Sequence, residues 1–168
     1  MLQTKLINRE GIRVFKQVSK TTNDDRLDDI IIQVQITELA PLLGDKLFNA
    51  LLNNPAGYTT LLNGGTYIVD EITHTNYGLK AVLAFYFDAY WKMFGDVTST
   101  PFGNVTKLNG GLSEPVTDAF KKSMFTINKQ SAFIIWQNVE HFLIRTKEPL
   151  FMTNCVVRNS GFRINKIR

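Results

Sequence analysis

The segment from Tyr77 to Phe94 is the feature that most limits how this 168-residue chain can fold. Its spacing predicts one helix, and apolar or aromatic side chains occupy nearly every position around that helix. Gly95 follows at a position where helices often end. A helix that is apolar on all sides needs cover on all sides, so the sequence predicts that this helix is central in the core or shared with a neighbouring subunit.

Apolar residues at helical spacing predict further helices, and therefore a mainly α fold: a bundle of about four helices with a small β-hairpin and an extended C-terminal arm. One helix is expected to begin at Asp24, because its acidic first turn suits the positive end of the helix dipole, and to be interrupted at Pro41. A second covers Leu43 to Asn53, and one more turn is possible near Leu61. The longest should open at Ser113 and Pro115 and run for about 30 residues. Its apolar stripe would comprise Val116, Phe120, Met124 (or Ser123), Ile127, Ser131, Ile134, Ile135, Val139, Phe142 and Leu143.

The connections contain two candidate β-segments. Tyr67–Val69 and Ile72–His74 flank Asp70-Glu71, which predicts a small hairpin. A possible strand, Asn104–Leu108, follows the loop that contains Thr100–Gly103.

Charge separates the chain into two parts. Residues 145–168 carry six basic side chains and one acidic side chain, a net charge of +5, and the rest of the chain has a net charge of −1. This asymmetry predicts a helical body at 1–146 and a basic arm at 147–168. Phe162–Asn165 alternates apolar and polar residues as a strand does, which favours strand addition to another subunit. The alternative is that the arm folds back to pair with Asn104–Leu108.

Composition also limits the compartment and the chemistry. The single cysteine, Cys155, cannot form an internal disulfide, residues 1–20 mix charges where a signal peptide would be apolar, and the longest apolar run is too short to cross a bilayer. We therefore expect a protein made in a cytosol, with no membrane contact. His74 and His141 have no metal-ligand spacing, and neither glycine pair forms a phosphate-binding loop. No catalytic residue, metal site or cofactor is expected.

Two charged clusters admit more than one interpretation. Asp24, Asp25, Asp28 and Asp29 suit a solvated first helical turn better than a cation site, and they could also meet basic groups of a neighbouring copy. Lys121, Lys122 and Lys129 on the longest helix are candidate DNA-facing residues, because phosphate contacts require only accessible cations.

Four segments together resemble head-tail connector (adaptor) proteins of tailed bacteriophages, most closely those of crAss-like phages. The likeness extends from about Leu27 to Trp136. It is carried by Leu42–Phe48 (LLGDKLF), Tyr58–Tyr67 (YTTLLNGGTY), Gly78–Phe85 (GLKAVLAF) and Thr100–Gly103 (TPFG).

The resemblance implies a mainly helical, non-enzymatic virion protein at the head–tail interface. Such subunits form a homo-oligomeric ring, typically dodecameric, beneath the portal protein. They extend the channel for genomic DNA, which they contact non-specifically, and provide the platform for further connector or tail proteins. The arm would then supply subunit or portal contacts. Its implied interface residues are Phe162, Arg163, Ile164, Lys166 and Ile167.

An alternative function is a small nucleic-acid-binding module that uses the basic tail, with Phe151 and Phe162 stacking on bases. It predicts steeply salt-dependent binding of short DNA by the monomer, which a connector does not need.

Overall fold

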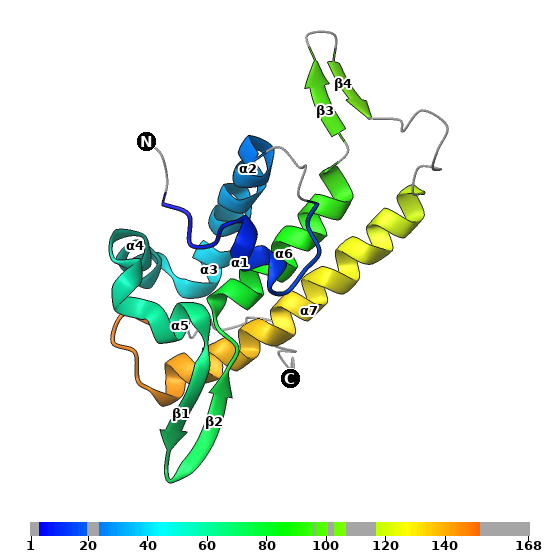
Figure 1. Cartoon of the computed structure of the whole chain (residues 1–168). Coiled ribbons are helices and arrows are strands. Elements are labelled where there is room, and N and C mark those ends of the chain that lie inside the picture. Colours follow the sequence, from blue (N-terminus) through cyan, green and yellow to red (C-terminus); the bar gives the residue numbers. More distant parts are fainter. Residues whose placement is uncertain (1–3, 20–23, 96, 101–102, 107–116, 152–168) are drawn as a thin grey trace, which may run out of the picture.

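The computed structural model describes residues 4–19, 24–95, 97–100, 103–106 and 117–151 (Figure 1). The mainly α-helical fold with a β-hairpin is confirmed. The helices are α1 (Arg9–Arg13), α2 (Asp24–Val34), the π-helix η1 (Gln35–Leu39), α3 (Ala40–Leu43), α4 (Asp45–Asn53), the 3₁₀-helix η2 (Pro55–Tyr58), α5 (Thr59–Asn63), α6 (Leu79–Phe94) and α7 (Asp118–Arg145). The strands are β1 (Gly65–Val69), β2 (Ile72–Asn76), β3 (Val97–Thr100) and β4 (Gly103–Thr106).

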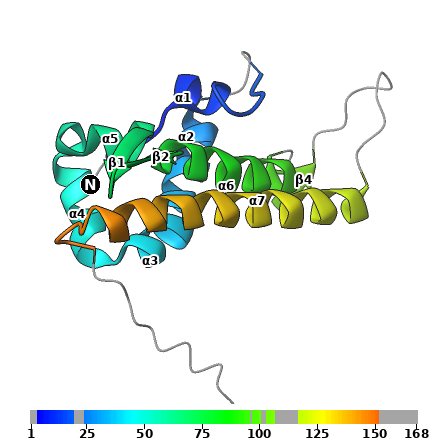
Figure 2. The same ribbon diagram turned by 90° about the horizontal axis from the view of Figure 1, so that it is seen from below.

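Helices α6 and α7 run side by side in opposite directions and form the long axis of the molecule (Figures 1 and 2). The shorter helices surround α6, and Figure 2 shows α1 and α3 on opposite sides of the α6–α7 pair. The helix predicted at Tyr77–Phe94 is present as α6, which begins at Leu79, and of the two predicted settings the central one is found in this chain. Its buried residues are Leu79, Ala81, Val82, Leu83, Ala84, Tyr86, Phe87, Asp88 and Ala89.

The helix that begins at Asp24 continues through Pro41, contrary to the predicted interruption there. Proline has no N–H, and its ring presses on the carbonyl four residues earlier, which strains an ordinary α-helix. Here the turn before it widens into η1, and the Ala40 N–H donates to the carbonyl of Gln35, five residues back. The break comes instead at Gly44, whose φ of 75° ends α3 and starts α4.

The predicted hairpin is present as β1 and β2, which pair antiparallel from Gly65 opposite Asn76 to Val69 opposite Ile72. Asp70 and Glu71 form its two-residue turn with φ values of 52° and 64°. Positive φ at both positions matches the right-handed twist of the strands.

A second hairpin, β3–β4, extends from the other end of α6 (Figure 1). The predicted Asn104 strand is therefore present, but it pairs with Val97–Thr100 of its own neighbourhood. Strand β3 was not predicted from the sequence. Residues 107–108 of the predicted strand and residues 152–168 of the arm lie outside the described residues, so the suggested pairing between Asn104–Leu108 and the arm stays a prediction.

The junction between β2 and α6 depends on two glycines in contact. Gly78 has φ 80°, and a Cβ placed on it would lie 2.4 Å from the backbone nitrogen of Gly64. Only glycine allows the two backbones to approach this closely. This contact fixes the hairpin against the start of the central helix.

The N-terminal segment contributes to the core, which the sequence analysis did not predict. Leu6, Ile7 and Ile12 are buried with the main hydrophobic cluster. No helix in the described part of the chain is both long and apolar enough to cross a membrane.

Candidate subunit interface on helix α7

Helix α7 has two apolar sides, of which one faces the core. Its buried residues are Asn128, Ala132, Trp136, Val139 and Leu143, which follow one another three or four positions apart. The predicted apolar stripe is therefore only partly correct. Its C-terminal members Val139 and Leu143 are buried, whereas three of its large N-terminal members face solvent.

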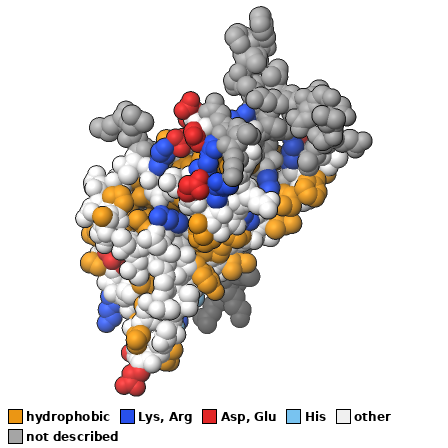
Figure 3. Space-filling view, viewed as in Figure 1, with side chains coloured by type: hydrophobic (Ala, Val, Ile, Leu, Met, Phe, Trp, Pro, Cys, Tyr) orange, Lys and Arg blue, Asp and Glu red, His pale blue; other side chains and the backbone are white. Residues whose placement is uncertain are grey.

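The exposed members are Phe120, Ile127 and Ile134, with 56%, 54% and 65% of their surfaces accessible. Because they are seven residues apart, they lie on one side of the helix, roughly opposite the buried face. Hydrophobic side chains follow α7 across the view in Figure 3. A soluble helix in this position normally presents charged and polar side chains to water.

The residues around these three are uncharged. We define the outer face of α7 as these residues and their helical neighbours: Phe120, Ser123, Met124, Ile127, Gln130, Ser131, Ile134 and Gln137. The charged side chains Lys122, Lys129 and Glu140 lie on the flank of the helix instead. An apolar surface from which charge is depleted is typical of the central part of a protein–protein interface.

The position of α7 is fixed by a polar cluster with aromatic surroundings. Glu38 accepts a hydrogen bond of 2.6 Å from the Tyr90 hydroxyl and an ion pair of 2.7 Å from Lys129 Nζ. The ammonium lies 5.6–6.0 Å from the ring centroids of Tyr86, Tyr90 and Phe125. These contacts connect η1, α6 and α7.

The same cluster keeps its tyrosines protonated. Burial, followed by the Glu38 carboxylate and Tyr90, raises the pKa of Tyr86 to about 12. Burial and the hydrogen bond to Glu38 also raise the pKa of Tyr90. Both hydroxyls are therefore neutral at physiological pH.

A second cluster joins the N-terminal segment to both long helices. The buried carboxylate of Asp88 lies 2.8 Å from Lys92 Nζ and 3.4 Å from Lys16 Nζ. Lys16 also donates to Asn128 Oδ1 at 3.0 Å, and its ammonium lies 3.7 Å from the centroid of Phe85. These charged groups therefore fix the N-terminal segment against α6 and α7.

The C-terminal half of α7 holds the β1–β2 hairpin. Asn138 Oδ1 accepts from the Tyr77 N–H, and its Nδ2 donates to the Thr75 carbonyl, both at 2.9 Å. Arg145 NH1 lies 3.1 Å from His74 Nδ1 and donates to the Tyr67 hydroxyl at 3.3 Å. His74 thus lies in a surface contact between hairpin and helix.

The structure separates the predicted DNA-facing lysines. Lys129 is engaged by Glu38 and the aromatic rings, whereas Lys122 is exposed on the flank of α7. Lys121 lies about a quarter turn from Lys122, so the three do not form one continuous basic stripe. The predicted arm interface, Phe162, Arg163, Ile164, Lys166 and Ile167, lies outside the described residues, as does Cys155.

The acidic run occupies the start of α2 as predicted. Asp24 pairs with Arg9 at 2.6 Å and Asp28 pairs with Lys5 at 2.5 Å. Both partners belong to the same chain, which supports the interpretation of this run as an ordinary helical first turn. Within the described ranges, no group of three or more histidine, cysteine or acidic side chains is arranged to hold a metal ion.

Sequence comparison places this architecture in a family. A family model with the description "Family of unknown function (DUF6712)" matches residues 39–161, which include α6, α7 and both hairpins. The chain belongs to this family. DUF6712 carries no functional assignment, and α1 and α2 precede the matched region. No curated protein and no solved structure matches the chain.

The outer face was missed because the predicted stripe combined residues from two sides of α7, with Ile127 and Ile134 on the same stripe as Val139. The signal that separates the two faces is present in the sequence. Ala132 and Trp136 continue the spacing of Val139 and Leu143, whereas Phe120, Ile127 and Ile134 follow a seven-residue interval about half a turn away. The first of these two patterns also includes Asn128, which is polar, so the series of core positions is harder to recognise in the sequence.

Proposed function

We propose that this chain is a structural virion protein that forms a ring at the head–tail vertex of a tailed bacteriophage. In this role it is made in the host cytoplasm, binds the portal protein, extends the channel for genomic DNA and provides the platform for further connector or tail proteins. The proposal rests on the resemblance of four sequence segments to head-tail connectors. The observation that carries it is the uncharged, exposed outer face of α7.

A ring of identical subunits needs one surface that recognises a different surface on the next copy. The outer face of α7 suits this task, because Phe120, Ile127 and Ile134 would each lose exposed apolar surface on contact. Repetition around a closed ring makes even modest contacts durable. The rigid attachment of α7 to α6 presents these side chains in a fixed row, which reduces the entropy lost on assembly.

A non-enzymatic role agrees with the use of charged groups in the described part of the chain. Glu38 of η1 pairs with Lys129 of α7, and Asp88 of α6 pairs with Lys16 of the N-terminal segment and with Lys92. These carboxylates already have ion-pair partners in the folded protein. They do not converge in a cleft, as the groups of an acid–base catalytic site do.

The contact with DNA in this proposal is weak and non-specific. Lys129 is engaged by Glu38, which leaves Lys122 as the exposed member of the predicted set. A channel that lets DNA pass needs few phosphate contacts, because each adds salt-dependent affinity.

The test is assembly of the purified full-length protein, with and without its candidate portal protein, by native mass spectrometry and negative-stain imaging. We expect rings or portal complexes from the unmodified chain and their loss in Ile127→Glu, which places a charge in the outer face. Ile144→Glu is the matched control, because Ile144 is also exposed on α7, at 46%, but outside the outer face.

Two outcomes would count against the proposal. If Ile127→Glu assembles as well as Ile144→Glu, the outer face is not the subunit contact. If every variant stays monomeric and the unmodified chain binds short DNA with steep salt dependence, the nucleic-acid-binding alternative replaces the ring.

A further inference from the structure

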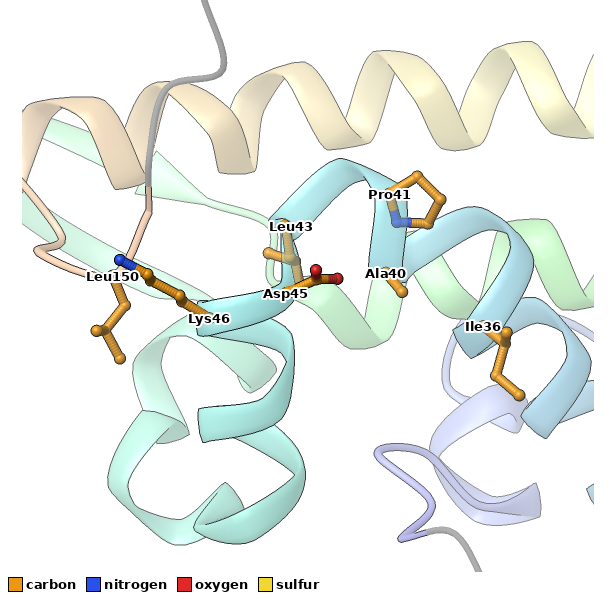
Figure 4. A pocket seen from close by; sticks show the side chains of 8 residues that line it. Ile36, Ala40, Pro41, Leu43, Asp45, Lys46 and Leu150 are labelled. Atoms are coloured by element: carbon orange, nitrogen blue, oxygen red, sulfur yellow. The ribbon is translucent and has the colours of Figure 1, made fainter.

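A groove of about 610 Å³ lies beside the bend between α3 and α4. Its walls are mostly apolar, with one carboxylate and one ammonium at the side. Figure 4 shows Leu150 and Lys46 at one end and Ile36 at the other, with Leu43, Asp45 and Pro41 between them. We call it the α3–α4 groove. Its volume lies within the range of pockets that hold small ligands.

The backbone around Pro41 creates this groove. Ile36 lies in the widened turn of η1 and is 49% exposed, whereas its neighbour Gln35 is fully buried. Gly44 then redirects the chain into α4. Ile36 therefore adds an exposed apolar side chain to a groove wall that is already apolar.

The segment that follows α7 lies at this groove. After α7, the Glu148 N–H donates to the Leu143 carbonyl at 3.0 Å, which turns the chain back along the helix end. Phe151 packs edge-on against Trp136 with ring centroids 6.3 Å apart, and Leu150 forms part of the groove wall. The described part of the chain therefore ends at the edge of the groove.

We propose that the α3–α4 groove binds residues 152–157 of the same chain. These residues are Met152, Thr153, Asn154, Cys155, Val156 and Val157, and none is charged, whereas Arg158 and the residues after it are increasingly basic. Their apolar side chains match the walls formed by Ile36, Pro41 and Leu43.

Chain length and concentration both favour the chain's own segment. Six extended residues span about 20 Å, enough to run from Leu150 past the middle of the groove. A segment tethered at the groove edge has an effective concentration in the millimolar range, well above that of a second copy at ordinary protein concentrations. This inference is independent of ring assembly, because it concerns a contact within one chain.

The single native cysteine allows a direct test. Cys155 lies five residues after Leu150, so the proposal places it toward the Ile36 end of the groove. We would prepare the full-length Ile36→Cys variant, oxidise it with oxidised glutathione, and follow disulfide formation by non-reducing electrophoresis and intact mass. The expected product is a monomer with an internal disulfide, formed at least about ten-fold faster than in Val14→Cys. Val14 is a suitable control, because it is 76% exposed and ends α1, on the other side of the α6–α7 pair.

A second variant tests the same contact without a disulfide. Ile36→Asp puts a charge in the groove, and we expect trypsin to cut after Arg158 several-fold faster than in the unmodified protein, while the circular dichroism spectrum is unchanged. Disulfide-linked dimers of Ile36→Cys would overturn the proposal in favour of a second copy's segment. A disulfide rate no higher than in Val14→Cys, or unchanged cleavage in Ile36→Asp, would overturn it altogether.

Discussion

Gln35 is a polar side chain with no exposed surface, and it ties the N-terminal segment to the helical body. Its Oε1 accepts from the Leu6 N–H at 2.7 Å, and its Nε2 donates to the Thr4 carbonyl at 3.1 Å. A buried amide that satisfies two backbone groups of a distant segment specifies where that segment lies. It also explains why a glutamine occupies a position that helical spacing assigns to the core.

Replacement of Gln35 by methionine keeps the volume but leaves the Leu6 N–H buried without its acceptor. We expect Gln35→Met to lower the free energy of unfolding by about 2 kcal/mol. Urea denaturation followed by circular dichroism measures this loss. Gln33→Met, at an exposed position of the same helix, is the control and should stay within about 0.5 kcal/mol. Equal stability of both variants would mean that the amide does not hold the N-terminal segment.

At the scale of elements, the sequence predicted those whose signals are local. The β1–β2 hairpin and the central helix needed only alternation, turn residues and a continuous apolar pattern. The extension of the Asp24 helix past Pro41 was not predictable in this way, because it depends on a widened turn that tertiary packing stabilises. Strand β3 was missed for a related reason. Val97–Thr100 is short, and its strand conformation depends on pairing with β4.

The candidate interface shows the same limit. The residues of the α7 stripe were identified, but the side that each faces depends on which helix packs against α7. Val139 and Leu143 face α6 and the core, whereas Ile127 and Ile134 do not. The buried Asn128 accepts a hydrogen bond from Lys16, which is 112 positions away in the sequence, so its partner could not be read from the local pattern.

Asn138 joins the end of the β1–β2 hairpin to α7 through two hydrogen bonds. Asn138→Ala removes its bonds to Tyr77 and Thr75, so we expect a loss of about 1–2 kcal/mol in stability and faster hydrogen exchange at the Tyr77 amide. Hydrogen exchange followed by NMR spectroscopy or mass spectrometry measures it. Gln137→Ala, at the exposed neighbouring position, should leave exchange unchanged. Unaltered exchange in Asn138→Ala would show that the hairpin is held by its other contacts.

Across the whole molecule, the fold depends on the glycine contact between hairpin and central helix. Gly78 and Gly44 have nearly the same backbone angles, φ 80° with ψ 154° and φ 75° with ψ 157°. A Cβ at Gly78 would overlap the backbone of Gly64, whereas a Cβ at Gly44 would meet no atom within 4 Å. The two positions therefore separate backbone strain from a steric clash.

We expect Gly44→Ala to lose about 1–2 kcal/mol through strain alone. Gly78→Ala adds the clash to the same strain, so we expect a loss above about 3 kcal/mol or a failure to fold. Thermal and urea denaturation of both variants compare these effects. A similar loss in the two would show that the backbones of Gly78 and Gly64 can move apart without consequence.

The direct continuation of β2 into α6, and the start of β3 close after it, give the molecule a mechanical property. Helix α6 carries one hairpin at each end, and α7, about 42 Å long for 28 residues, braces it along its side. Glu38 binds Tyr90 of α6 and Lys129 of α7, and Lys16 binds Asp88 of α6 and Asn128 of α7. Each of the two groups therefore bridges the helices and resists their sliding, because a shift would break contacts that are partly shielded from water. A force on one hairpin is therefore transmitted through α6 to the other hairpin, because α6 and α7 move as one rigid unit.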